Sequence, residues 1–220
     1  MMKFEAVLFD CDGVLVDSEP LTNAVLRDML EERGWTLTSA QCTALFLGKT
    51  LREEGAVIEA HTGQPLTQAW LEMFYERRNQ VLRAGLEMVS GAREAVAAAH
   101  LHTGERIACA SGADRFKVEM QLNKVGLMAY FEGRVFSGHE MARSKPAPDV
   151  YLAASSHLGA HPSRCLVVED SVAGICAGVA AGATVWAYCP EPLQEPALRQ
   201  AGATLVFSSM GELPCLLGVH

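Results

Sequence analysis

Two aspartates separated by a single residue are the first candidates for chemistry in this sequence. Asp10 and Asp12 directly follow the apolar run 6–9, in the segment FDCDGVLVDSE. Such a run predicts a buried strand, and open α/β sheets bind ligands at the carboxyl ends of their strands. Two neighbouring carboxylates are costly to bury unless a cation neutralises them. The pair could instead start a loop and cap a helix, because Asp-x-Asp-Gly also occurs in turns and calcium-binding loops.

Two further segments offer groups that could bind a phosphate. Ser111 and Gly112 follow the apolar run 107–110 and provide a hydroxyl and accessible backbone amides. Lys145 stands in SKPAPDVY, near the start of a predicted helix, where a cation opposes the helix dipole and indicates a role linked to an anion. Taken singly, such a serine is more often a turn or capping residue, and such a lysine a solvated surface charge.

A second acidic pair, Glu169 and Asp170, ends the apolar run 165–168. Two carboxylates at a strand end suit the oxygen-rich coordination that Mg²⁺ prefers. They could equally be residues at a helix start that accept hydrogen bonds from free backbone amides. For this pair alone both interpretations stay open, but the order of all four features along the chain favours a site for phosphate and metal.

Together, FDCDGVLVDSE, the serine after ACA, the lysine of SKPAPDVY and the segment VVEDSVAGICAG resemble the haloacid dehalogenase superfamily. The resemblance is to its branch with a helical cap, which includes sugar-phosphate phosphatases and β-phosphoglucomutase. It implies that Asp10 attacks phosphorus and is transiently phosphorylated. It also implies that Asp12 protonates the leaving oxygen and then activates water.

The same resemblance implies a Mg²⁺ cofactor and a set of phosphate-binding groups. The metal ligands would be Asp10, the backbone carbonyl of Asp12, Glu169 and Asp170. The phosphoryl oxygens would be bound by Ser111, Gly112 and Lys145. A divalent cation and a lysine would then offset the charge of four carboxylates around an anionic substrate.

These roles predict a phosphatase that hydrolyses a small phosphate monoester, a sugar phosphate or phosphogluconate, through an aspartyl-phosphate intermediate. The alternatives are a phosphosugar mutase of the β-phosphoglucomutase type and a catalytically idle binding protein. Thr22 stands where the mutase pattern has a histidine, and Leu51 where it has a loop arginine. Both departures favour hydrolysis over the mutase.

The resemblance also implies that the cap domain selects the substrate. The candidate substrate-binding residues in the cap are Lys49, Thr50, Arg52 and Arg78. Each of the three basic residues could equally belong to a solvated helix face.

The elements that must position these residues follow a β-α rhythm. Strands are predicted at residues 6–9, 107–110, 165–168, 184–188 and 204–207. Helices are predicted at residues 91–99, 115–125, 149–158 and 173–181. Continuously apolar strands alternating with helices predict a Rossmann-like, doubly wound parallel sheet, covered on both faces.

One stretch interrupts this rhythm. Four helical patterns, at residues 21–33, 39–47, 52–61 and 67–83, follow the first strand with no strand signal between them. They predict a small all-helical cap domain over residues 18–87, inserted into a core formed by residues 1–17 and 88–220. Polar segments at 16–19 and 84–91 would be its hinges.

Composition limits the classes of function. The 220 residues carry a formal net charge of −8 and are half hydrophobic, which predicts a globular protein that binds neither nucleic acid nor anionic membrane. Its seven cysteines form no CxxC pair, and its N-terminus lacks the features of a signal peptide, so we expect a reducing, cytoplasmic location. The expected partner is a small phosphorylated metabolite, and the expected state is a monomer or small homo-oligomer.

Overall fold

The structure is a computed structural model that describes residues 4–46 and 51–219. The chain divides into two compact units. One is formed by Met1–Asp17 together with Glu87–His220, and the other by Ser18–Leu86. Each unit has its own buried apolar cluster, as expected of a domain.

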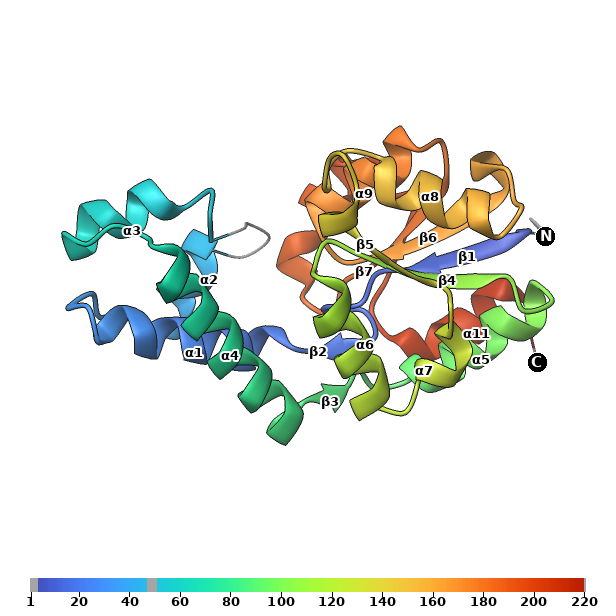
Figure 1. Cartoon of the computed structure of the whole chain (residues 1–220). Coiled ribbons are helices and arrows are strands. Elements are labelled where there is room, and N and C mark those ends of the chain that lie inside the picture. The colour runs from blue at the N-terminus through green and yellow to red at the C-terminus, as the bar shows by residue number, and fades with distance from the viewer. Residues whose placement is uncertain (1–3, 47–50, 220) are drawn as a thin grey trace. The chain divides into compact units, whose positions relative to one another are not determined.

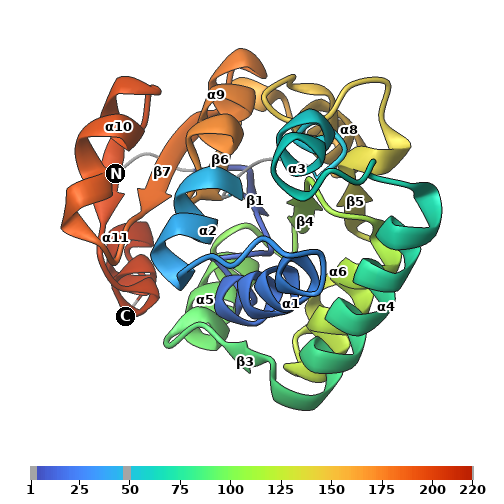
Figure 2. The ribbon, with the colours of Figure 1, turned by 90° about the vertical axis from the view of Figure 1, so that its left-hand side faces the viewer.

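The larger unit is built on a parallel sheet of six strands in the order β5-β4-β1-β6-β7-β8. The strands are β1 (Ala6–Phe9), β4 (Ile107–Ser111), β5 (Val135–Ser137), β6 (Cys165–Glu169), β7 (Thr184–Tyr188) and β8 (Leu205–Phe207). Figure 2 looks along the strands and shows β1 in the middle of the row, between β4 and β6. The predicted doubly wound α/β fold is confirmed, because the chain reverses its direction of winding at β1.

Helices cover both faces of this sheet (Figure 1). On one face lie α5 (Ala92–His102), α6 (Arg115–Lys124), α7 (Met128–Phe131) and α11 (Leu213–Leu217). On the other lie α8 (Asp149–His157), α9 (Val172–Ala180) and α10 (Glu195–Gln200). Because both faces are covered, β1, β4 and β6 are buried at every position, which is why their sequences are apolar without alternation.

The register of the central strands brings their carboxyl ends level. Phe9 at the end of β1 pairs with Cys109 of β4 and with Val168 of β6. The Asp10 backbone N–H donates to the Val168 carbonyl at 3.0 Å, which extends the ladder by one residue. Residues that follow β1, β4 and β6 therefore meet at one edge of the sheet.

The sequence patterns did not predict the shortest strands. β5 has three residues at the edge of the sheet, and β2 (Val16–Asp17) and β3 (Glu87–Met88) form an antiparallel pair of two residues each in the expected hinge segments. Runs this short carry no periodicity of their own, so pairing with a distant partner decides them. The described part of the unit also contains the 3₁₀ turns η1 (Gly138–Glu140), η2 (Pro162–Arg164), η3 (Pro192–Gln194) and η4 (Met210–Glu212).

The smaller unit is all-helical over its described residues. Its helices are α1 (Glu19–Glu31), α2 (Ser39–Phe46), α3 (Gly55–Thr62) and α4 (Gln68–Gly85). The third begins at Gly55, later than the expected position 52, because Arg52 and Glu53 are exposed in a turn with no buried face to support a helix. Apolar side chains of α1 and α4, such as Met29, Trp70 and Phe74, form the centre of its core.

No helix within residues 4–46 and 51–219 combines the length and the apolar character needed to cross a lipid bilayer.

Candidate active site

Asp10 and Lys145 form the centre of the acidic site at the carboxyl edge of the sheet. Asp10 directly follows β1 and is only 7% exposed. Lys145 Nζ donates to Asp10 Oδ1 at 2.6 Å, to Glu169 Oε1 at 2.7 Å and to the Ala110 carbonyl at 3.0 Å. The lysine side chain is nearly buried, and its three partners occupy the donors of one ammonium group. Lys145 thus connects the ends of β1, β4 and β6.

Glu169 is fully buried and surrounded by hydrogen-bond donors. Besides Lys145, the Tyr151 hydroxyl donates to Oε1 at 2.8 Å. Oε2 accepts from the backbone N–H groups of Asp170 and Ser171 and from the Ser171 hydroxyl, each at 3.0 Å. Gly174 leaves the space for this carboxylate, because a Cβ there would lie 1.6 Å from Oε1. Glu169 therefore holds both Lys145 and the loop that carries Asp170.

The pKa values show how charge is shared among the three buried groups. Burial, helped by the nearby charges of Glu169 and Asp12, raises the pKa of Asp10 to about 7 in spite of the opposing effect of Lys145. Burial also works against the charges of Lys145 and Glu169. For Lys145, the attraction of Asp10 and then of Glu169 outweighs burial and holds its pKa well above the usual value. For Glu169, the charge of Lys145 and the hydrogen bonds that the carboxylate accepts outweigh burial and hold its pKa below the usual value. Glu169 and Lys145 form an ion pair, whereas Asp10 retains a proton up to neutral pH unless another cation is added.

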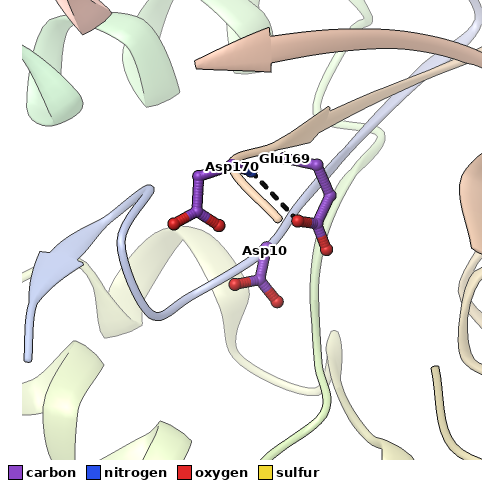
Figure 3. A group of neighbouring side chains, drawn as sticks. All are labelled: Asp10, Glu169 and Asp170. Carbon is purple, nitrogen blue, oxygen red and sulfur yellow. Dashed lines mark hydrogen bonds between the residues drawn. The ribbon is translucent and has the colours of Figure 1, made fainter. Parts of the chain in front are cut away.

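The site therefore fits a divalent cation. Asp10, Glu169 and Asp170 each offer one carboxylate oxygen, and these atoms lie within 4.8 Å of one another. Figure 3 shows the three side chains and the hydrogen bond between Glu169 and the Asp170 backbone. Gly13, with a φ of +77°, lets the neighbouring loop pass close to Asp170, since a Cβ there would lie 2.0 Å from Asp170 Oδ2. Carboxylate oxygens are the ligands that Mg²⁺ prefers.

Asp12 lies two residues after Asp10 in the loop that follows β1, and its side chain points toward α6. Lys117 Nζ donates to Asp12 Oδ1 at 2.9 Å and to Oδ2 at 2.7 Å, and Gln121 Nε2 donates to Oδ1 at 2.8 Å. Between the two aspartates, Cys11 is buried, and its thiol contacts Gln121 Oε1 at 3.6 Å. A hydrogen bond with Cys109, burial and the nearby carboxylates raise the pKa of Cys11 well above its usual value, which makes its thiol a poor nucleophile.

Ser111 and Gly112 lie at the end of β4, on the same edge as Asp10. Ser111 is 1% exposed, and its Oγ accepts from the Ala113 backbone N–H at 3.1 Å. The hydroxyl thus stabilises the turn after β4, as the alternative interpretation of this serine held. Its role in binding phosphate stays a prediction.

The cap candidates differ from one another in their surroundings. Lys49 and Thr50 lie outside the described residues. Arg52 is exposed and donates to Gln68 Oε1 at 2.6 Å. Arg78 is buried, donates to Asn79 Oδ1, and places its guanidinium carbon 4.9 Å from the centre of the Tyr75 ring. Substrate binding by these four residues stays a prediction.

The sequence did not predict a role in the site for Lys117, Gln121 and Tyr151. Lys117 and Gln121 are four residues apart and share a helical face with the buried Val118 and Leu122. Polar side chains on an apolar helical face are the signal that could have singled them out. The sequence around Tyr151 carries no such signal, because a tyrosine ring is common in an apolar core. Its role in the site is seen only from the hydrogen bond that its hydroxyl donates to Glu169.

A doubly wound sheet with carboxylates and a lysine at the ends of its central strands is the arrangement expected of an α/β enzyme with a ligand site at that edge of the sheet. The chain belongs to the haloacid dehalogenase-like hydrolase family, whose model matches residues 4–182. The resemblance inferred from the sequence is thereby confirmed. So is its prediction of a phosphatase, because curated relatives over nearly the whole chain are phosphatases.

Two of these relatives act on phosphates of six-carbon compounds, as their names state. The chain is 31% identical to 6-phosphogluconate phosphatase of Escherichia coli K12 over 217 residues, which cover 97% of this chain and 95% of the relative. It is 30% identical to hexitol phosphatase B of Escherichia coli O157:H7 over 213 residues, which cover 94% and 93%.

Solved structures show the same architecture. A HAD family hydrolase from Deinococcus radiodurans R1, with bound phosphate and sodium, is 32% identical with a TM-score of 0.81 and covers 100% of this chain and 98% of its own. A putative β-phosphoglucomutase from Thermotoga maritima is 26% identical with a TM-score of 0.78, at coverages of 97% and 98%.

Proposed function

We propose that the protein is a Mg²⁺-dependent phosphatase that hydrolyses a sugar phosphate or a phosphorylated sugar acid through an aspartyl-phosphate on Asp10. The observation that carries this proposal is the buried contact of Asp10 with Lys145, 2.6 Å apart, beside two further carboxylates. A nucleophilic carboxylate, a lysine for the phosphoryl oxygens and an acidic cluster for a cation are the groups that phosphoryl transfer needs.

In the first half of the reaction, a carboxylate oxygen of Asp10 attacks phosphorus. The bond between phosphorus and the ester oxygen breaks, and the leaving oxygen takes a proton from Asp12. The products are the free alcohol and an acyl phosphate on Asp10. Lys145, which already donates to Asp10, is placed to stabilise negative charge on the transferred group.

In the second half, Asp12 works as a base. It removes a proton from a water molecule, whose oxygen attacks the same phosphorus atom. The bond between phosphorus and the Asp10 oxygen breaks, which releases inorganic phosphate and restores the Asp10 carboxylate. Asp12 ends the cycle protonated, ready to act again as an acid.

The cation would be held by Asp10 and Asp170, with Glu169 close by and the Asp12 backbone carbonyl as expected from the family pattern. When bound, Mg²⁺ supplies positive charge that neutralises the carboxylates and the phosphoryl group. Asp10 needs such a partner in order to be an ionised nucleophile at neutral pH, because its pKa is raised to about 7 without one.

The substrate class follows from the relatives. Phosphatases for 6-phosphogluconate and for hexitol phosphates match nearly the whole chain, so we propose a phosphate ester of a six-carbon sugar, sugar acid or sugar alcohol. A mutase is not favoured, since these curated relatives are phosphatases and Thr22 and Leu51 depart from the mutase pattern.

The test is release of inorganic phosphate from a panel of esters, with Mg²⁺ and with a chelator in parallel. The panel contains 6-phosphogluconate, hexitol phosphates, hexose phosphates and glycolytic esters, and the Asp10→Asn variant is the blank. Metal-dependent release from a narrow group of six-carbon esters would support the proposal. Release that persists with the chelator would contradict the metal requirement. Conversion of β-glucose 1-phosphate to an isomer that keeps its phosphate would indicate a mutase.

A further inference from the structure

Helix α6 directs two polar side chains at the carboxylate of Asp12. Lys117 donates to both Asp12 oxygens, at 2.9 and 2.7 Å, and Gln121 donates to one of them at 2.8 Å. Lys117 is 7% exposed and Gln121 is fully buried. Burying an ammonium group and an amide is unfavourable unless their partners are well placed, so this is a built arrangement rather than a chance surface contact.

The helix that carries these side chains is itself anchored. Asp114 caps its first turn by accepting the Lys117 backbone N–H at 2.8 Å. The Ser137 hydroxyl of β5 donates to the Ala113 carbonyl at 2.6 Å, which ties the turn before the helix to the sheet. Lys117 and Gln121, one helical turn apart, therefore face Asp12 from a fixed base.

Gln121 is also held at its other end. Its Oε1 accepts a weak hydrogen bond from the Cys11 thiol at 3.6 Å, which leaves Nε2 directed at Asp12. Cys11 and Asp12 belong to the same loop, so one amide side chain connects two consecutive residues of the loop to α6. The hydrogen bonds between this loop and α6 therefore restrict the rotation of the Asp12 side chain.

We propose that Lys117 and Gln121 are positioning residues for Asp12, which keep its carboxyl group in the place where it exchanges a proton with the leaving oxygen and with water. This inference rests on the proposed function, in which Asp12 is the acid and base. Neither residue needs to touch the substrate. Both act by orienting Asp12, and Lys117 also stabilises the carboxylate that remains after proton donation.

A purely structural role for the Lys117–Asp12 pair would give a different kinetic result from a positioning role. If the pair only joined the loop to α6, its loss would slow the reaction of every phosphate ester alike. If it positions an acid, its loss should matter only when the leaving oxygen needs a proton. A sugar alkoxide needs that proton, whereas p-nitrophenolate is stable enough to leave without it.

The experiment compares 6-phosphogluconate with p-nitrophenyl phosphate as substrates of the Mg²⁺-loaded enzyme. The variants are Lys117→Met, Lys117→Arg and Gln121→Leu, and the matched control is Lys124→Met, at the exposed end of the same helix. The quantity compared is kcat/KM, because it covers only the steps up to departure of the leaving group and is independent of the later hydrolysis of the phosphoenzyme. Circular dichroism and thermal melting show that each variant is folded.

For Lys117→Met we expect kcat/KM to fall by about 100-fold with 6-phosphogluconate and by less than about threefold with p-nitrophenyl phosphate. Gln121→Leu should show the same contrast on a smaller scale. Lys117→Arg should recover much of the loss, and Lys124→Met should match the wild type with both substrates.

Equal losses with the two esters, or a gain in activity, would overturn the positioning role. If Lys117→Met does not fold, Gln121→Leu carries the same comparison. The proposed function has a separate test in this design. Wild-type enzyme that hydrolyses neither ester with Mg²⁺ would contradict the phosphatase mechanism itself, whereas active wild type without the contrast would contradict only the inference.

Discussion

The ammonium nitrogen of Lys145 lies 2.6 Å from a carboxylate oxygen of Asp10, although the two residues are 135 positions apart in the chain. The same nitrogen lies 2.7 Å from Glu169. One cation thus faces two buried carboxylates, and removing any of the three groups changes the charge balance of the remaining two.

Replacing Asp10 by asparagine should abolish turnover and leave the fold intact. The amide has the shape of the carboxylate and keeps an oxygen for Lys145, but it cannot form the acyl phosphate. We expect phosphate release to fall by at least about 1000-fold. A coupled phosphate assay measures this, with the circular dichroism spectrum as the control for folding. Activity near that of the wild type would rule out Asp10 as the nucleophile.

Replacing Lys145 by methionine should destabilise the protein by about 3–5 kcal/mol, because Glu169 then loses its buried counter-charge. Urea unfolding measures the change. The double variant Lys145→Met/Glu169→Gln should recover part of the stability but none of the activity, since it removes one unpaired charge without restoring the lysine. A single variant within about 1 kcal/mol of the wild type would show that the lysine charge contributes little to stability.

The stability of the metal-free protein should fall as pH rises toward neutrality. Burial raises the pKa of Asp10 to about 7, and the unfolded value is near 4, so the folded state binds the proton more tightly. The Asp10 contribution, up to about 4 kcal/mol, is complete below about pH 4 and is lost by about pH 7.

Mg²⁺ competes with this proton, so its stabilising effect should grow with pH over the same range. Melting curves with Mg²⁺ or chelator, at about pH 5.5 and about pH 7.5, test the prediction. The Asp10→Asn variant is the control, in which the growth with pH should largely disappear. A Mg²⁺ shift of the melting temperature that is independent of pH in the wild type would contradict the proposed competition.

Replacing Gly174 by alanine should displace Glu169, because the new Cβ would lie 1.6 Å from its Oε1. We expect at least about 1–3 kcal/mol of destabilisation, and a loss of activity as Lys145 loses its partner. Gly85→Ala is the matched control: it also stands in a helix, but its Cβ would lie 3.9 Å from the nearest atom, a Leu21 methyl carbon. Similar stabilities for both variants would show that Glu169 can move freely.

The parallel core and the identity of its chemical groups were accessible from the sequence because both are local properties. Each of the strands β1, β4, β6 and β7 is built on a short, mainly apolar run, and the candidate side chains come directly after the runs of β1, β4 and β6. The edge strand β5 and the β2–β3 pair were missed, since two or three residues form a strand only when a distant partner supplies their hydrogen bonds.

By itself the sequence determined which residues stand at the strand ends: Asp10 and Asp12, Ser111, and Glu169 with Asp170. Ligands of open α/β sheets bind outside the carboxyl ends of strands, so residues that follow an apolar run could be singled out before the strand order was known. Only the tertiary structure decided what each group touches. Lys117 meets Asp12, and Tyr151 meets Glu169, across 105 and 18 positions of the chain. These pairings depend on how the helices pack against the sheet, and no local pattern of residues encodes a contact between two distant segments.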